Sequence, residues 1–175
     1  MWDLSTQALL TRQAAEEVDL RALELHPDGL VLCTAGARGP LAVWETRSQK
    51  SVAALTGHAG PVNALAFSEN GYHLASAGDD GVRVWDLRKQ RQIALWEEFA
   101  GARAVQFDLS GLFLAMGGDR GVQVAGAKQA WGVLGQLPAD ALHKGAAAAL
   151  AWGADAKTLY VGGGDHNLRV FQCAQ

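Results

Sequence analysis

The chain has 175 residues, a length typical of one ordinary domain, and 49% of them are apolar, which suffices for a core and argues against bulk disorder. The formal net charge of -3 excludes a uniformly basic nucleic-acid-binding surface. No apolar run approaches the about 18 residues that a membrane span needs. The first residues lack the basic leader and apolar core of a signal peptide, so we expect a cytosolic or nuclear protein.

Two cysteines, Cys33 and Cys173, lie in apolar segments and have no partner at CxxC spacing. Such thiols are usually buried and reduced, so we expect neither a disulfide nor a metal site at these positions. No other residue pattern indicates a bound cofactor.

Four short turn-like segments recur at nearly constant spacing. Their first residues are 42, 40 and 45 positions apart, and an alternating apolar strand flanks each of them: His26-Pro27-Asp28-Gly29, Ser68-Glu69-Asn70-Gly71, Asp108-Leu109-Ser110-Gly111 and Gly153-Ala154-Asp155-Ala156. A period of about 40–45 residues is typical of the four-stranded blade of a WD40 β-propeller. We therefore predict an all-β fold, a partial WD40 propeller of about four blades.

The chain begins within a repeat. Trp2-Asp3-Leu4 matches Trp85-Asp86-Leu87, the end of a third strand in a later repeat, and residues 6–12 then supply the outer strand. The predicted organisation is one propeller domain, with the end of a truncated blade at 1–12 followed by blades at 20–55, 57–96, 102–137 and 143–174. Since these rings usually close with more blades, we expect a piece of a longer protein.

The repeat at 57–96 shows the blade pattern most clearly. Apolar residues alternate over 62–66, 72–77 and 82–86, and a more polar segment at 92–96 suits an exposed outer strand. In three of the four repeats the third strand ends in a large aromatic residue, namely Trp44, Trp85 or Phe171. We expect these side chains to pack between neighbouring blades, where each buries about 150–250 Å².

One segment of the last repeat argues against a strand. Residues 140–150 are rich in alanine and have strong helix propensity. The repeat register instead places residues 146–152 in the innermost strand of the blade. We follow the register, because small side chains suit the crowded axis of a propeller.

The residues Gly57-His58, Ser76, Asp79 and Trp85 resemble the structural tetrad of WD-repeat proteins. In that family a His, a Ser or Thr, an Asp and a Trp form a hydrogen-bonded chain across one blade, which gives each buried polar group a partner. A catalytic Ser-His-Asp triad is the alternative interpretation. It is disfavoured because no nucleophile elbow is present.

The acid of this tetrad has two candidates. Asp79, Asp119 and Asp165 each lie six positions before the last residue of a third strand, where a carboxylate can accept backbone N–H groups of the turn. The turn that contains Asp79 and Asp80 is one residue shorter than is usual in the family, so Asp80 is the alternative. The shared spacing favours Asp79.

The rim of the propeller is the predicted site for partners. Alignment of the inner strands puts Arg21, Asn63, Arg103 and Ala148 in one equivalent position near the mouth of the channel. Two guanidinium groups and an amide can bind an acidic or carbonyl-rich segment. The alternative is a set of solvated residues without a partner.

The densest basic stretch contains Arg83, Arg88, Lys89 and Arg91. A short basic segment of this kind is typical of a solvated outer edge. RNA contact is the alternative, but only Trp96 remains there as a stacking aromatic, so direct nucleic-acid contact is not expected.

Several strings resemble the last blades of the pre-mRNA-processing factor 19 family. The more specific are Ser68-Glu69-Asn70-Gly71-Tyr72 and Trp85-Asp86-Leu87-Arg88-Lys89, and the similarity runs in order from about residue 20 to residue 171. The resemblance implies nuclear E3 ubiquitin ligases of the RING type that are also spliceosome scaffolds with links to DNA repair. Family members carry an N-terminal U-box, a coiled coil that forms a homotetramer, and a C-terminal propeller that recruits ubiquitylation substrates and spliceosomal proteins.

No U-box or coiled-coil residues lie in this chain, so we expect no catalytic residue in it. The function that the resemblance implies is a protein–protein interaction module of such a splicing factor and ligase. The alternative is a generic WD40 adaptor or scaffold in another multiprotein complex. An enzyme is disfavoured because the sequence shows no paired carboxylates, metal-ligand set or nucleophile constellation.

Overall fold

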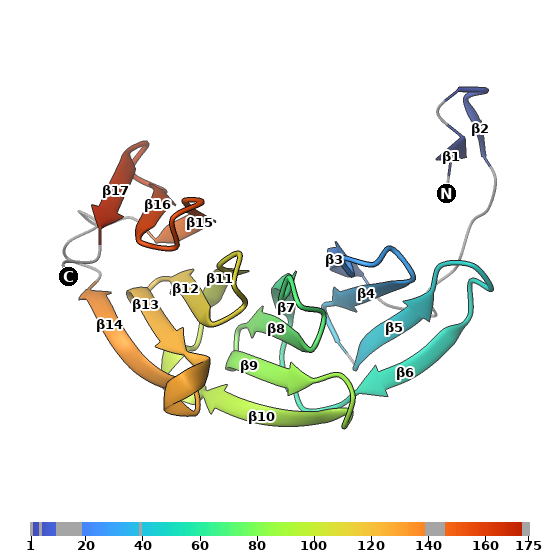
Figure 1. The fold of residues 1–175 in the computed structure, drawn as a ribbon, viewed down its shortest axis with the longest axis horizontal. Coiled ribbons are helices and arrows are strands. Elements are labelled where there is room, and N and C mark those ends of the chain that lie inside the picture. Colours follow the sequence, from blue (N-terminus) through green and yellow to red (C-terminus); the bar gives the residue numbers. More distant parts are fainter. Residues whose placement is uncertain (1, 4, 10–18, 39, 139–145, 173–175) are drawn as a thin grey trace.

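The computed structural model describes residues 2–3, 5–9, 19–38, 40–138 and 146–172. Antiparallel sheets of three or four strands follow one another along an open arc, and each sheet is formed by one contiguous stretch of chain (Figure 1). This arrangement confirms the predicted all-β fold, a partial propeller.

The strands pair in chain order within each sheet. The first sheet contains β3 (Leu20–Leu25), β4 (Val31–Gly36), β5 (Leu41–Glu45) and β6 (Ser51–Leu55). The second contains β7 (Val62–Phe67), β8 (His73–Gly78), β9 (Gly81–Asp86) and β10 (Arg91–Trp96). The third contains β11 (Ala102–Phe107), β12 (Phe113–Gly118), β13 (Gly121–Gly126) and β14 (Gly132–Pro138), and the fourth contains β15 (Ala147–Trp152), β16 (Thr158–Gly163) and β17 (Leu168–Gln172).

A short hairpin and two 3-10 turns complete the described fold. A separate hairpin pairs β1 (Trp2–Asp3) with β2 (Ala8–Leu9), and 10–12 of the predicted truncated blade lie outside the described residues. Single 3-10 turns, η1 (Glu97–Phe99) and η2 (Ala127–Gln129), follow β10 and β13. The alanine-rich β15 is a strand, so the register prediction is confirmed over the helix propensity.

The four recurring segments form the turns between the first and second strands of the sheets. In each turn the last residue has a positive φ, at Gly29 (72°), Gly71 (71°), Gly111 (67°) and Ala156 (52°). Its N–H donates to the carbonyl of the first residue, for example from Gly71 to Ser68 at 2.8 Å. Glycine tolerates this left-handed conformation at no steric cost, which explains its recurrence in three of the four turns.

The core lies between the sheets rather than in one central body. Trp85 is 2% exposed and packs with Val43, Leu55 and Cys33 at the junction of the first two sheets, which confirms its predicted place between blades. Burial raises the pKa of the Cys33 thiol to about 12, so this buried thiol stays protonated. Cys173 lies outside the described residues.

The two ends of the arc carry exposed apolar side chains. Leu23 on β3 is 62% exposed and Leu168 on β17 is 71% exposed. In the part of the chain that the structure describes, no further sheet covers these faces. The same part contains no helix long and apolar enough to span a membrane.

Candidate functional site

The predicted rim position is a repeated structural feature. In each sheet the pairing of the first two strands shifts by one residue near the start of the first strand, and the extra residues are Arg21, Asn63, Arg103 and Ala148. A β-bulge of this kind leaves one residue unpaired and redirects its side chain. The four positions that sequence alignment made equivalent are therefore equivalent in the backbone as well.

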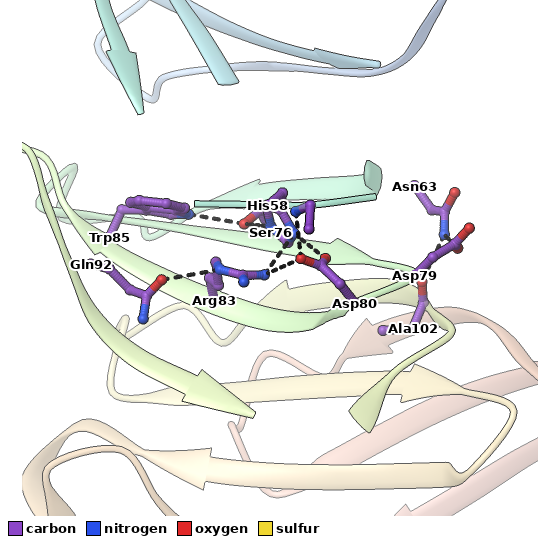
Figure 2. Close-up of polar contacts among 10 residues, drawn as sticks. His58, Asn63, Ser76, Asp79, Asp80, Arg83, Trp85, Gln92 and Ala102 are labelled. Carbon is purple, nitrogen blue, oxygen red and sulfur yellow. Dashed lines mark hydrogen bonds and ion pairs between the residues drawn. The ribbon is translucent and has the colours of Figure 1, made fainter. Parts of the chain in front are cut away.

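Asn63 joins three neighbouring sheets at this rim. Its side-chain oxygen accepts a hydrogen bond from the Arg21 guanidinium at 3.3 Å. Its amide nitrogen donates to Oδ1 of Asp79 at 2.9 Å and to the carbonyl of Ala102 at 3.1 Å, as Figure 2 shows for the last two contacts. The amide thereby fixes the side chain of Asp79 at the edge of the second sheet.

The rim is of mixed charge, which differs from the predicted cationic grip. Arg103 pairs with Asp119 at 3.1 Å, and both side chains are more than half exposed. A cavity of about 360 Å³ opens here between Asn63, Asp79, Gly101, Arg103 and Asp119. An exposed ion pair contributes only about 0–1 kcal/mol, so a partner can replace it at little cost.

The second sheet contains one continuous polar network (Figure 2). The indole N–H of Trp85 donates to Oγ of Ser76 at 2.9 Å, and Nε2 of His58 lies 2.7 Å from the same oxygen. Nδ1 of His58 lies 2.6 Å from Oδ1 of Asp80. Because an ionised carboxylate only accepts, Nδ1 carries the proton, and the Ser76 hydroxyl donates to Nε2 of a neutral imidazole.

Asp80 occupies the acidic position of this network, and the prediction of Asp79 is wrong. Asp80 accepts hydrogen bonds from His58 and from the N–H of Ala59 at 2.7 Å, whereas Asp79 points to Asn63. The short turn is the reason. With one residue fewer between the acid and the third strand, the residue five positions before Trp85 reaches His58, so the spacing of six does not identify it.

Asp79 and Asp119 also differ from their predicted role in the turn. Their described contacts run to Asn63 and Arg103, one strand away, rather than to N–H groups of their own turn. Asp165, in the longer turn of the last repeat, does accept an N–H, from Asn167 at 3.3 Å.

Arg83 belongs to the network and not to a solvated basic edge. It is 7% exposed, its NH1 group donates to Oδ2 of Asp80 at 3.0 Å, and its Nε donates to Gln92 on the outer strand at 3.1 Å. This role of Arg83 was not predicted from the sequence. The available signal was an acid three or four residues before a strand arginine, which occurs at Asp80 and Arg83 and again at the ion pair of Asp165 and Arg169.

The network cannot act as a catalytic triad despite its Ser, His and Asp. Ser76 is 0% exposed and the side chain of His58 is 1% exposed, so a substrate has no access to the hydroxyl. The hydroxyl is also held by the Trp85 indole. The described residues contain no group of three or more side chains arranged to hold a metal ion.

Known proteins share the repeat and align with nearly the whole chain. The family model "WD domain, G-beta repeat" matches residues 49–86, which include His58, Ser76, Asp80 and Trp85. Over 97% of its length the chain is 40% identical to "Pre-mRNA-processing factor 19 homolog 2" of Arabidopsis thaliana and 39% identical to "Pre-mRNA-processing factor 19" of Oryza sativa subsp. japonica. The chain belongs to the WD-repeat family.

The resemblance to the factor 19 proteins is confirmed by these matches. The human protein of that name is 35% identical, again over 97% of the chain. The chain spans about a third of the length of these curated relatives, namely 33%, 33% and 34%. It matches their WD-repeat part.

The WD-repeat tetrad is complete in one described sheet and reduced in its neighbours. In the first sheet the indole of Trp44 donates to Oγ1 of Thr34 at 2.8 Å. This sheet therefore keeps the tetrad's hydrogen bond between the Trp and the hydroxyl group. In the third sheet, Met116 and Ala125 occupy the positions of Ser76 and Trp85, and the buried Phe99 packs in the same cluster. That sheet therefore relies on apolar packing.

The neutral His58 predicts a pH-dependent stability. Burial lowers the pKa of His58 below its ordinary 6.5, while Asp80 acts in the opposite direction and Arg83 lowers it further. His58 therefore binds a proton more readily in the unfolded chain than in the folded one. Its contribution to the free energy of unfolding is complete above about pH 6.5 and is lost as the pH falls below that value. Burial lowers the pKa of His73 in the same sense.

Melting temperatures measured by circular dichroism between about pH 8 and about pH 5 test this expectation. We expect the melting temperature to fall on the acidic side, and the variant His58→Gln to show a smaller slope because it removes the contribution of His58 and leaves that of His73. An equal slope in both proteins would contradict the role of His58.

Proposed function

We propose that the chain is a protein–protein interaction module of a pre-mRNA-processing protein, and that its bulged rim residues contact the partners. Three supports carry this proposal. The similarity to proteins named pre-mRNA-processing factor 19 covers 97% of the chain. The rim presents Arg21, Arg103 and Asp119 to solvent around a polar cavity. The WD-repeat sheets bury their polar network as a scaffold.

Rigid placement is the physical advantage of this rim. The bulged residues stand on strands rather than on long loops, and Asn63 connects the first, second and third sheets by hydrogen bonds. A preorganised surface loses less conformational entropy on binding. Because guanidinium and carboxylate groups alternate along it, we propose a polar partner segment that exchanges the Arg103–Asp119 pair for contacts of its own.

The wider proposal concerns the longer protein. As the family resemblance implies, we propose that it is a nuclear E3 ubiquitin ligase of the U-box type and a homotetramer through its coiled coil. The present chain then recruits spliceosomal proteins and ubiquitylation substrates and carries none of the transfer chemistry.

Charge reversal at the rim tests the proposal. The double variant Arg21→Glu and Arg103→Glu is expected to reduce capture of spliceosomal proteins from nuclear extract by about tenfold to a hundredfold, since a charged hydrogen bond contributes about 1.5–3 kcal/mol. Quantitative mass spectrometry of the captured proteins measures the loss. Both positions are exposed, so the melting temperature should change little.

The matched control reverses two exposed cations away from the rim, Arg47 and Lys128, to glutamate. Its net charge changes by the same amount, so it should retain capture. Equal capture by both double variants would rule out the rim as the binding surface. Capture of a different multiprotein complex would favour the generic adaptor function instead.

A further inference from the structure

A groove lies between the first two sheets, and none of its lining residues belongs to the rim. It encloses about 270 Å³, and its walls are mainly apolar: Val31, Val43, Val52, Ala53, Leu55, Phe67 and Leu87, with His26, Asp28, Gly71, Arg88 and Gln90 at its borders. Ligand pockets usually span about 300–1,000 Å³, so this space suits a single large side chain. Both flanking sheets have all four strands.

The next junction of the same molecule shows what fills this space. Trp131 is 8% exposed and packs edge-on against Phe107 and His73, with ring centroids 5.9 Å and 5.3 Å apart. Phe107 is the last residue of β11 as Phe67 is of β7, and His73 begins β8 as Val31 begins β4. The two junctions are thus related by the repeat.

Trp131 is an extra residue that the second sheet lacks. Gly126 pairs with Gly132, which leaves residues 127–131 in the turn, whereas Asp86 pairs with Arg91 and leaves only residues 87–90. The indole comes from this longer turn. The shorter turn places no aromatic side chain against Phe67 from that direction, and the groove between the first two sheets stays open.

We propose that this groove binds an aromatic side chain, preferably tryptophan, of a partner protein. Val43, Leu55 and Phe67 are each less than 9% exposed and offer a dry wall for the ring. The Asp28 carboxylate at the border is 46% exposed and can accept the indole N–H. Aromatic anchors in such pockets dominate many interfaces.

The groove is already shaped in the free chain. His26 lies edge-on to Phe67 at 5.1 Å, and its Nε2 donates to the carbonyl of Gly71 at 3.0 Å, which ties the border of one sheet to the turn of the next. The guanidinium of Arg88 stacks over Tyr72 at 4.1 Å and so stays out of the apolar space.

Methyl NMR spectra of the 175-residue chain, titrated with N-acetyl-tryptophanamide, test the proposal. We expect saturable shifts of the Val43, Val52, Leu55 and Leu87 methyl signals. The variant Val52→Glu should lose them, because it puts a charge at the apolar entrance of the groove. Val133→Glu is the matched control, an exposed valine of another outer strand outside the groove, and should keep them. No shifts at these methyls, or equal binding by both variants, would overturn the proposal.

A graft provides an independent test. Insertion of a tryptophan between Gln90 and Arg91 reproduces the longer turn of the third sheet, and the new indole should occupy the groove. The inserted chain is expected to lose the response to the probe, with its other methyl signals dispersed as before. An inserted chain that binds the probe like the original would contradict the equivalence of the two junctions.

Discussion

Replacement of Trp85 by alanine is expected to lower the free energy of unfolding by about 3–5 kcal/mol, the usual cost of removing a buried aromatic side chain. Trp85 is 2% exposed and packs in the buried core between the first two sheets. The neighbouring strands cannot close the space without breaking their own pairing. Urea denaturation followed by circular dichroism measures the change.

A second substitution separates packing from hydrogen bonding. Trp85→Phe keeps most of the apolar contact but loses the N–H that donates to Ser76 and a small part of the ring volume, so we expect a loss of about 1–2 kcal/mol. Trp44→Ala serves as a comparison, because Trp44 is only half-buried and should cost less than Trp85. A loss below about 1 kcal/mol for Trp85→Ala would show that this junction does not support the fold.

The variant Asp80→Ala is expected to cost about 2–4 kcal/mol, the range for removing a charged partner from a largely buried network. It leaves three donors without their acceptor: the imidazole of His58, the N–H of Ala59 and the guanidinium of Arg83. The lost acceptor matters because the side chains of His58 and Arg83 are 1% and 8% exposed and have little access to water. Urea denaturation again gives the free energy.

Asp79→Ala is the matched control, one residue earlier in the same turn. Asp79 is exposed and loses only its contact with Asn63, so we expect about 0–1 kcal/mol. The ¹⁵N chemical shifts of His58 add a second measurement, since Asp80→Ala alone should disturb the proton on Nδ1. Equal losses for the two variants would contradict the assignment of Asp80, and a larger loss for Asp79→Ala would favour Asp79.

The contribution of Asp80 to the free energy of unfolding also depends on pH. Burial alone would raise the pKa of Asp80, but hydrogen bonds from Ala59 and His58, together with the charge of Arg83, lower it below its ordinary 3.8. A lowered carboxyl pKa stabilises the fold above that value, so this contribution is lost only as the pH falls below about 3.8. The His58 effect begins at a higher pH, which keeps the two apart.

The second repeat shows which structural features the residue patterns predicted correctly and which they did not. Alternating apolar residues predicted its strands, and the aromatic at the end of the third strand predicted the position of Trp85 between blades. Turn length limited the prediction of the polar residues. A single missing residue moved the acidic position from Asp79 to Asp80, and nothing in the spacing of the other repeats reported that shift.

The sequence by itself determined the repeat, the strands and the equivalence of the rim positions, because these depend on periodicity along the chain and on turn chemistry. Only the tertiary structure decided which charges are buried, as at Arg83, and which are paired, as at Arg103 and Asp119. It also decided that Trp131 closes the groove at one junction, whereas the corresponding groove at the other junction stays open. Arg103 and Asp119 meet across the strands of one sheet, so their pairing depends on how these strands align. The filling of a groove depends on a sheet about 40 residues away in the chain, and no local pattern records what that sheet presents.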